Sequence, residues 1–262
     1  SVEGRPFTEM EVTRVSAGVS PSASLLEPPQ GIEVPEEAQA VPAGGDASSG
    51  AEVREVAPGV HVVARLRGGF HPLFVEFDDF VVAVDAPAGY PIWDGLSASD
   101  VAPGPAVDWL SRRYLELIAE TLPRKPVRYV VVTHFHNDHA GGLRAFVARG
   151  AAVLAAPSAA EPIRSLVRAP HTLAPDLLAR EGGELRLEVV EGRRKITDGR
   201  RTLEILDVGP NPHTAHMLVV RLPEEGLWFV SDLLDRTRVE RFPKPEHAAL
   251  DRWFGEWLRR EG

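Results

Sequence analysis

Short apolar runs bounded by turn residues dominate the first patterned part of the chain. Val, Ile, Leu and Phe are concentrated in these runs, and Asp78 and Asp79 stand between the second run and the third. This pattern is typical of β-strands joined by tight turns. We therefore expect three successive strands over residues 60–66, 73–77 and 80–84, the last of which ends at Asp85.

The middle of the chain alternates between helical spacing and short apolar runs. Apolar residues recur at helical intervals until Pro123, which ends the pattern. A buried strand follows, and after a His-rich turn come a short helix, another buried strand and helical pieces interrupted by prolines. In chain order these elements are expected over residues 107–122, 127–132, 140–149, 151–156 and 157–180.

The last third of the chain returns to a strand pattern. Strands are expected over residues 185–190, 194–196, 202–208, 217–222 and 227–230, and a helix over 245–260. Strand meanders separated by helices predict an α+β architecture of two mixed sheets with helices outside them.

The first 50 residues differ from the remainder of the chain. Five prolines between positions 21 and 42 break any periodicity, and residues 44–50 have the Gly- and Ser-rich composition of a linker. We expect residues 1–50 to form an extended or peripheral segment and residues 51–262 to form one domain.

Composition excludes several classes of chemistry. A net charge of -9 argues against nucleic-acid binding, which needs an excess of Lys and Arg. The absence of Cys excludes disulfides, thiol nucleophiles and Cys-ligated zinc. The longest apolar runs are too short to span a bilayer, so no membrane partner is expected. The chain begins at Ser1 and not at Met, which leaves a removed leader and the compartment open; the oligomeric state is open too.

The strongest chemical signal is the segment that follows the strand expected over 127–132. It contains His134, His136, Asp138 and His139 and is followed by two glycines. In extended backbone, residues two apart project to the same side, so His134 and His136 can converge on one ion. Asp138 and His139 lie where the chain turns and can face a second ion. Imidazole nitrogens and carboxylate oxygens are ligands that suit zinc.

This His-x-His-x-Asp-His motif resembles the signature of the metallo-β-lactamase superfamily, and further residues support the resemblance. The family expects an Asp at the end of an earlier strand, and Asp85 fits. It expects a third His between two late strands, commonly before Thr, and His213-Thr214 fits. It expects an Asp after the next strand, and Asp232 fits. These elements occur in the family's order over residues 52 to about 235.

The resemblance implies a four-layer αββα sandwich of the metallo-β-lactamase type, with the active site along one edge of the two sheets. The implied metal ligands are His134, His136 and His213 for a first ion, Asp138 and His139 for a second, and Asp232 between the two. By the same resemblance Asp85 would orient a ligand His through a hydrogen bond. A carboxylate that merely caps the end of its strand is the alternative.

The chain departs from the family at its end. The family usually supplies another His after a helix and a final strand, whereas this chain stops at Gly262. Either the natural chain continues or the second metal is weakly held. His247 falls at a helix start and is interpreted as a solvated residue. His216 could line the pocket, donate to the substrate or replace the missing ligand, although an ordinary half-buried His is favoured.

The function implied is that of a metal-dependent hydrolase acting on a small molecule. A metal-bound hydroxide would attack an ester, thioester, lactone or amide-type substrate, and Asp138 would assist proton transfer. The expected cofactor is Zn²⁺, as one or two ions, with iron or manganese as alternatives because imidazole suits all three. Two other functions stay open: an iron-dependent redox enzyme resembling the sulfur dioxygenases of this fold, and a non-catalytic metal-binding member.

Overall fold

The computed structural model describes residues 50–66, 71–88, 107–172, 174–234 and 245–261. The expected N-terminal segment, residues 1–50, lies outside the described residues apart from Gly50. The division of the chain at residue 50 therefore stays a prediction.

The larger sheet contains seven strands in sequential order. Its first four strands pair antiparallel as a meander, and β4, β5, β6 and β7 pair parallel. The strands are β1 (Glu52–Ala57), β2 (Val60–Ala64), β3 (Leu73–Glu76), β4 (Val81–Val84), β5 (Val127–Val132), β6 (Ala152–Ala155) and β7 (Arg186–Val189). Parallel pairing needs crossover connections, and the segments between β4 and β7 supply them with helices.

The second sheet contains four strands in the order β11-β10-β9-β8, all of them antiparallel. They are β8 (Arg193–Thr197), β9 (Thr202–Asp207), β10 (Leu218–Leu222) and β11 (Leu227–Phe229). The expectation of mixed pairing therefore holds for the larger sheet, while the described strands of the second sheet form a plain meander.

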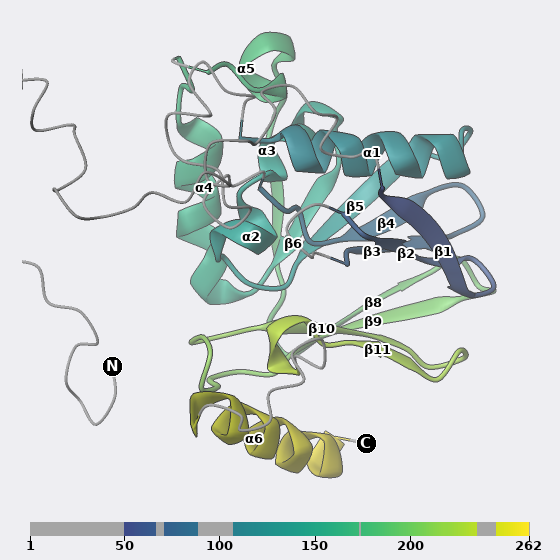
Figure 1. Ribbon diagram of the computed structural model, residues 1–262, viewed down its shortest axis with the longest axis vertical. Helices are drawn as coiled ribbons and strands as arrows, with labels where there is room; N and C mark the ends of the chain where they lie inside the picture. The colour runs from purple at the N-terminus through teal and green to yellow at the C-terminus, as the bar shows by residue number, and fades with distance from the viewer. Residues whose placement is uncertain (1–49, 67–70, 89–106, 173, 235–244, 262) are drawn as a thin grey trace, which may run out of the picture. The chain divides into compact units, whose positions relative to one another are not determined.

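Helices and sheets form four layers (Figure 1), and three apolar clusters lie between them. The first lies between the larger sheet and the helices α1 (Trp109–Thr121), α3 (Leu143–Ala148) and α4 (Ala160–Arg168). The second fills the space between the two sheets, and the third lies between the second sheet and α6 (Pro245–Glu261). This is the expected αββα sandwich.

Side-chain alternation on β5 shows how one strand serves two layers. Val130 and Val132 belong to the cluster under the helices, whereas Val131 belongs to the cluster between the sheets. Successive strand residues face opposite sides of a sheet, so a strand covered on both sides must be apolar throughout. The apolar run Val130–Val132 therefore reflects burial on both faces of the sheet.

Two local features differ from the sequence prediction. Strand β1 was not predicted, because three consecutive residues, Arg54, Glu55 and Val56, are exposed and leave no clear alternation of apolar and polar positions. Pro162 does not interrupt α4, since it lies in the first helical turn, where the missing N–H has no intrahelical partner to lose. The remaining short helices are α2 (Asn137–Ala140) and α5 (Leu177–Glu181), with 3-10 turns at Pro157–Ala159 and Ser231–Leu233.

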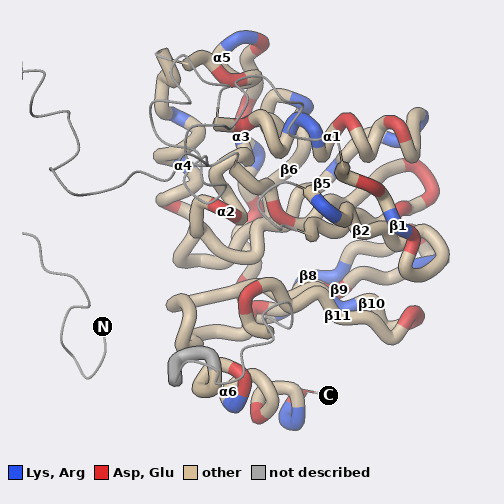
Figure 2. Tube along the Cα trace, in the orientation of Figure 1, with Lys and Arg blue, Asp and Glu red and all other residues tan. Residues whose placement is uncertain are grey.

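Charged residues of both signs alternate over the described helices and strands (Figure 2). Many form ion pairs, such as Arg113 with Glu120 and Lys195 with Glu204, each at 2.8 Å. Among the described residues, no helix is long and apolar enough to cross a membrane.

The two sheets meet at the end of β5. The backbone N–H of Leu218, at the start of β10, donates to the carbonyl oxygen of Thr133 at 2.8 Å. On the other side, the N–H of Asp85 donates to the carbonyl of Val131 at 2.8 Å. The ends of β4 and β5 and the start of β10 are thereby joined at one edge of the sandwich.

Candidate metal centre

The turn after β5 is held in place by the segment that follows β4. The N–H of Ala86 donates to the carbonyl of His139 at 2.8 Å, and the N–H of Gly142 donates to the carbonyl of Ala86 at 2.9 Å. Helix α2 begins directly after His136, whose N-cap backbone is extended. The change from extended to helical backbone turns the side chains that follow His136 toward a second position.

Gly141 and Gly142 permit a close approach between neighbouring segments. A Cβ on Gly141 would lie 2.6 Å from the Cβ of Ala88, and one on Gly142 would lie 2.5 Å from the carbonyl oxygen of Pro87. It would also overlap the hydroxyl of Ser111 in α1. The glycines therefore let the turn pack against the segment after β4 and against α1.

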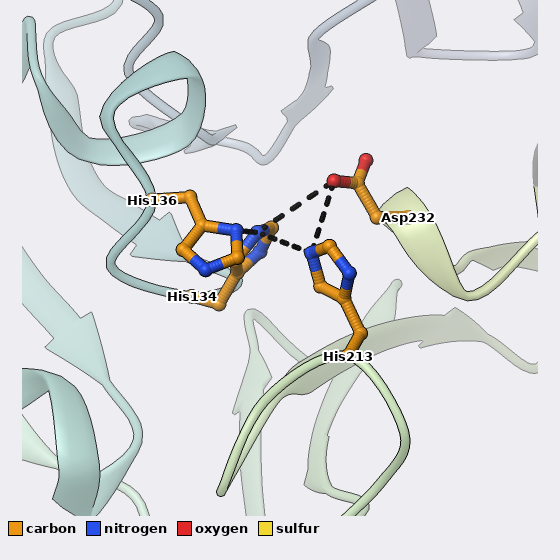
Figure 3. Close-up of side chains that lie close together, drawn as sticks. All are labelled: His134, His136, His213 and Asp232. Carbon is orange, nitrogen blue, oxygen red and sulfur yellow. Dashed lines mark hydrogen bonds and ion pairs between the residues drawn. The ribbon is translucent and has the colours of Figure 1, made fainter. Parts of the chain in front are cut away.

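Four side chains converge at this edge to form a first group: His134, His136, His213 and Asp232 (Figure 3). Nε2 of His134 lies 3.0 Å from Nδ1 of His136 and 3.2 Å from Nε2 of His213. Oδ2 of Asp232 lies 3.3 Å from Nε2 of His213. All four ligand atoms lie within 4.8 Å of one another.

These spacings fit a four-coordinate cation. Zinc–nitrogen bonds of 2.0–2.1 Å in tetrahedral geometry place neighbouring nitrogens about 3.3 Å apart. The nitrogen–nitrogen distances of 3.0 Å and 3.2 Å are close to that value. The donor set, three imidazoles and one carboxylate, therefore suits a divalent transition metal in both chemistry and spacing.

A second group adjoins the first and shares one residue with it. It consists of Asp138, His139 and Asp232. Nε2 of His139 lies 3.5 Å from Oδ2 of Asp138 and 3.3 Å from Oδ1 of Asp232. The other oxygen of Asp232, Oδ2, is the one that faces the first group. One carboxylate thus presents an oxygen to each group.

Asp85 lies behind both groups and is only 4% exposed. Its Oδ1 accepts from the N–H and from the hydroxyl of Thr133, each at 2.8 Å, and its Oδ2 lies 2.8 Å from Nδ1 of His139. The predicted hydrogen bond to a motif His is confirmed, and Asp85 also caps the end of β5. Its φ of 64° is a left-handed conformation that Asp tolerates better than most residues.

The same network sets the tautomers of two imidazoles. Because Oδ2 of Asp85 can only accept, Nδ1 of His139 carries the hydrogen. The hydroxyl of Thr133 donates its hydrogen to Asp85, so its oxygen accepts a hydrogen bond from Nδ1 of His134 at 3.1 Å. In both residues Nε2 is left as the atom that faces the group, which is the arrangement that metal-binding imidazoles need.

Electrostatics favour a positive charge here. Burial, helped by the neighbouring His139, lowers the pKa of His134 to about 2, which keeps it neutral. Burial also opposes charge on His139, but Asp85, Asp138 and Asp232 outweigh it and raise its pKa well above the usual value. Burial likewise opposes ionisation of Asp232, yet His139 and His213 hold its pKa far below the usual range. Three carboxylates around one imidazole form an anionic site that attracts a cation.

Two further histidines from the sequence analysis stand apart. Nδ1 of His216 lies 2.8 Å from Oδ2 of Asp207, at the end of β9, and His216 is half-buried. Within the described part of the chain, neither metal-binding group includes it. His247 lies in the first turn of α6, and its side chain is outside what the structure describes.

Sequence reasoning missed the supporting polar residues. Thr133 links Asp85 to His134, and the hydroxyl of Ser231 lies 3.1 Å from the hydroxyl of Thr133 and 3.3 Å from Nδ1 of His139. The available signal was weak: each is a small polar residue directly before a motif residue, where an apolar strand ends. The partners come from distant parts of the chain, so no local spacing reveals them.

Comparison with known proteins agrees with this fold. The family model described as "Metallo-beta-lactamase superfamily" matches residues 102–259. A metallo-beta-lactamase from Pontibacter korlensis is similar in structure, with a TM-score of 0.51 and 19% identity, over 80% of this chain and 87% of that one. DIM-1 metallo-beta-lactamase is similar too, with a TM-score of 0.51 and 16% identity, over 79% and 85%. Curated proteins gave no match.

Proposed function

Because the chain belongs to the metallo-beta-lactamase superfamily, we propose that it is a metal-dependent hydrolase of a small ester, thioester, lactone or amide-type substrate. The observation that carries the proposal is the pair of adjoining donor groups that share Asp232. A shared carboxylate with one oxygen on each side suits two neighbouring cations, the arrangement that assists displacement at a carbonyl or phosphoryl centre.

The proposed ligands follow the two groups. His134, His136 and His213 would hold a first ion, Asp138 and His139 would hold a second, and Asp232 would supply one carboxylate oxygen to each group. When bound, a divalent metal lowers the pKa of a coordinated water from about 15.7 towards 7 and polarises a substrate carbonyl. Zinc is the proposed metal, and iron and manganese are the alternatives that metal analysis distinguishes.

Asp138 is the proposed proton acceptor. Burial opposes its ionisation, but its interaction with His139 outweighs burial and lowers the pKa of the carboxyl. It is therefore a carboxylate at neutral pH and can accept a hydrogen bond from an attacking water. Its side chain is partly exposed, so a proton can pass from it to solvent.

The residues behind the groups keep the imidazoles fixed. His134 is fully buried, whereas His136, His213 and Asp232 are partly exposed. The site is therefore closed from behind and open in front, where a substrate can approach. Asp85 holds the ring of His139 and Thr133 holds that of His134, which lowers the free energy needed to orient these two rings when a metal or a substrate binds.

The test combines metal analysis with a substrate panel. Protein purified without added metal is expected to carry at least one transition metal, and the double variant His134→Ala/His136→Ala is expected to lose most of it. His216→Ala is the matched control, because it removes an imidazole that lies three positions after His213 in the chain and belongs to neither group. Full metal occupancy in the double variant would contradict the site assignment.

The panel should contain an ester, a thioester, a lactone and a β-lactam. We expect hydrolysis of at least one of them, loss of that activity on chelation and its return when zinc is added. A metal-loaded protein that hydrolyses none of these substrates would contradict the proposed function while leaving the metal site in place.

A further inference from the structure

A small apolar pocket lies beside the turn that carries the candidate ligands. Its volume is about 130 Å³. One wall is formed by Phe135 and Asn137 from the turn, and the other by Pro162, Ile163 and Leu166 from α4. Asn137 is the only polar side chain among these residues, and none of them carries a charge.

Phe135 connects this pocket with the metal-binding groups. It stands between His134 and His136 in the chain, and its ring packs edge-on against that of His136 with a centroid distance of 5.5 Å. Phe135 is 41% exposed and is the only aromatic residue among the large exposed apolar side chains in the described part of the chain. A phenyl ring held at the surface beside candidate ligands leaves apolar area free for a bound molecule to cover.

We propose that this pocket binds an apolar arm of the substrate, a phenyl ring or a branched alkyl group of similar size, while the scissile bond lies at the His and Asp groups. The inference rests on the proposed hydrolase function and adds a substrate class to it. An apolar cavity of about 150 Å³ in another protein binds benzene, so this volume suits one ring. An anionic arm is disfavoured, because no cationic side chain lines the pocket.

The substrate series that tests this inference is a set of methyl esters whose acyl group grows from acetate through butanoate to phenylacetate. Each methylene that enters an apolar site contributes about a fourfold gain. We therefore expect kcat/KM of the metal-loaded protein to rise about fourfold per methylene until the pocket is filled. Binding of benzyl alcohol, followed by NMR shifts, reports on the pocket without any turnover.

Two variants change the pocket in opposite ways. Phe135→Ala removes one wall and should flatten the chain-length dependence, with metal content measured in parallel because of the neighbouring His136. Leu166→Trp fills the pocket and should reduce benzyl alcohol binding and phenylacetate turnover at least tenfold. Val189→Trp is the control, since it adds the same side chain at an exposed position on β7.

The outcomes separate this inference from the proposed function. Ester hydrolysis that is indifferent to chain length and to Leu166→Trp would overturn the pocket assignment and leave the hydrolase function standing. Absence of hydrolysis, together with benzyl alcohol binding that Leu166→Trp abolishes and Val189→Trp preserves, would overturn the hydrolase function and leave the apolar pocket as a binding site. Failure of benzyl alcohol to bind the wild-type protein would also overturn the pocket assignment.

Discussion

Replacing Asp85 with Asn changes a single atom and reverses one hydrogen bond behind the metal centre. Oδ1 of the amide can keep both bonds from Thr133, and Asn tolerates the left-handed backbone at this position. The amide nitrogen, however, would face Nδ1 of His139, which lies 2.8 Å from Oδ2 of Asp85. Two donors cannot share that contact, so the imidazole must move its hydrogen from Nδ1 to Nε2.

With its hydrogen on Nε2, His139 would have no lone pair to offer a metal at the second group. Changes to the outer partners of metal ligands typically cost 10- to 100-fold in metal affinity. We therefore expect Asp85→Asn to weaken zinc binding at the second group by about 10- to 100-fold, or about 1.4–2.8 kcal/mol. Affinity at the first group should change by less than tenfold, because Thr133 still accepts from His134.

The assay is a zinc titration of metal-free protein against a competing chelator, with nitrogen-15 NMR to identify the tautomer of His139. Thr133→Val serves as the comparison, since it removes the hydroxyl that supports His134 and keeps the backbone N–H that Asp85 binds. It should weaken the first group more than the second. Wild-type affinity at both groups in Asp85→Asn, with the hydrogen still on Nδ1 of His139, would refute the reasoning.

Three further predictions concern metal stoichiometry and stability. Titration of the metal-free wild-type protein should show one tight and one weak step, because the first group has three imidazoles and the second only one; two equally tight steps would mean that another residue supplies a ligand. Arg144→Met should lower the free energy of unfolding by about 3–5 kcal/mol in urea titrations, because it leaves the buried Asp176 without its main cation; a loss below about 1 kcal/mol would contradict this. Burial opposes ionisation of Asp198, but the backbone N–H groups of Arg201, Arg200 and Asp78 outweigh it and lower its pKa to about 2. Its contribution is therefore fully present above the unfolded value of about 3.9 and is lost as the pH falls through about 2, so Asp198→Ala should cost about 1 kcal/mol at pH 7 and clearly less at pH 2, measured by thermal unfolding.

Much of the fold follows from local patterns that survive in the three-dimensional structure. The bounds of β5 were predicted correctly, and its last three residues, Val130, Val131 and Val132, form an apolar run that is buried on both faces of the sheet. The prediction for α1 was right because Leu110, Tyr114, Leu117 and Ile118 keep helical spacing and are all buried. Strand β1 was not predicted because an edge strand needs little apolar surface. Its pairing with β2 defines it more than its composition does.

The site divides in the same way. Residues close in the chain, such as His134 and His136, could be assigned to one group from spacing alone. The pairing of His216 with Asp207 and the wall that Leu166 forms opposite Phe135 depend on how separate elements approach one another. Such contacts could not be predicted from the sequence, because they form only when the elements pack and neither segment alone indicates its partner.

The joining of distant segments at the edge of the sandwich has a mechanical consequence. His134 and His213 are 79 positions apart, and they belong to connections of different sheets. A metal held by both would act as a reversible cross-link across a long loop in a chain that has no cysteine with which to make a permanent one. At a free metal concentration 100 times its dissociation constant, such a link adds about 2.7 kcal/mol to the free energy of unfolding. The attachment of one sheet to the other would then vary with the supply of metal, and resistance to proteolysis would vary with it.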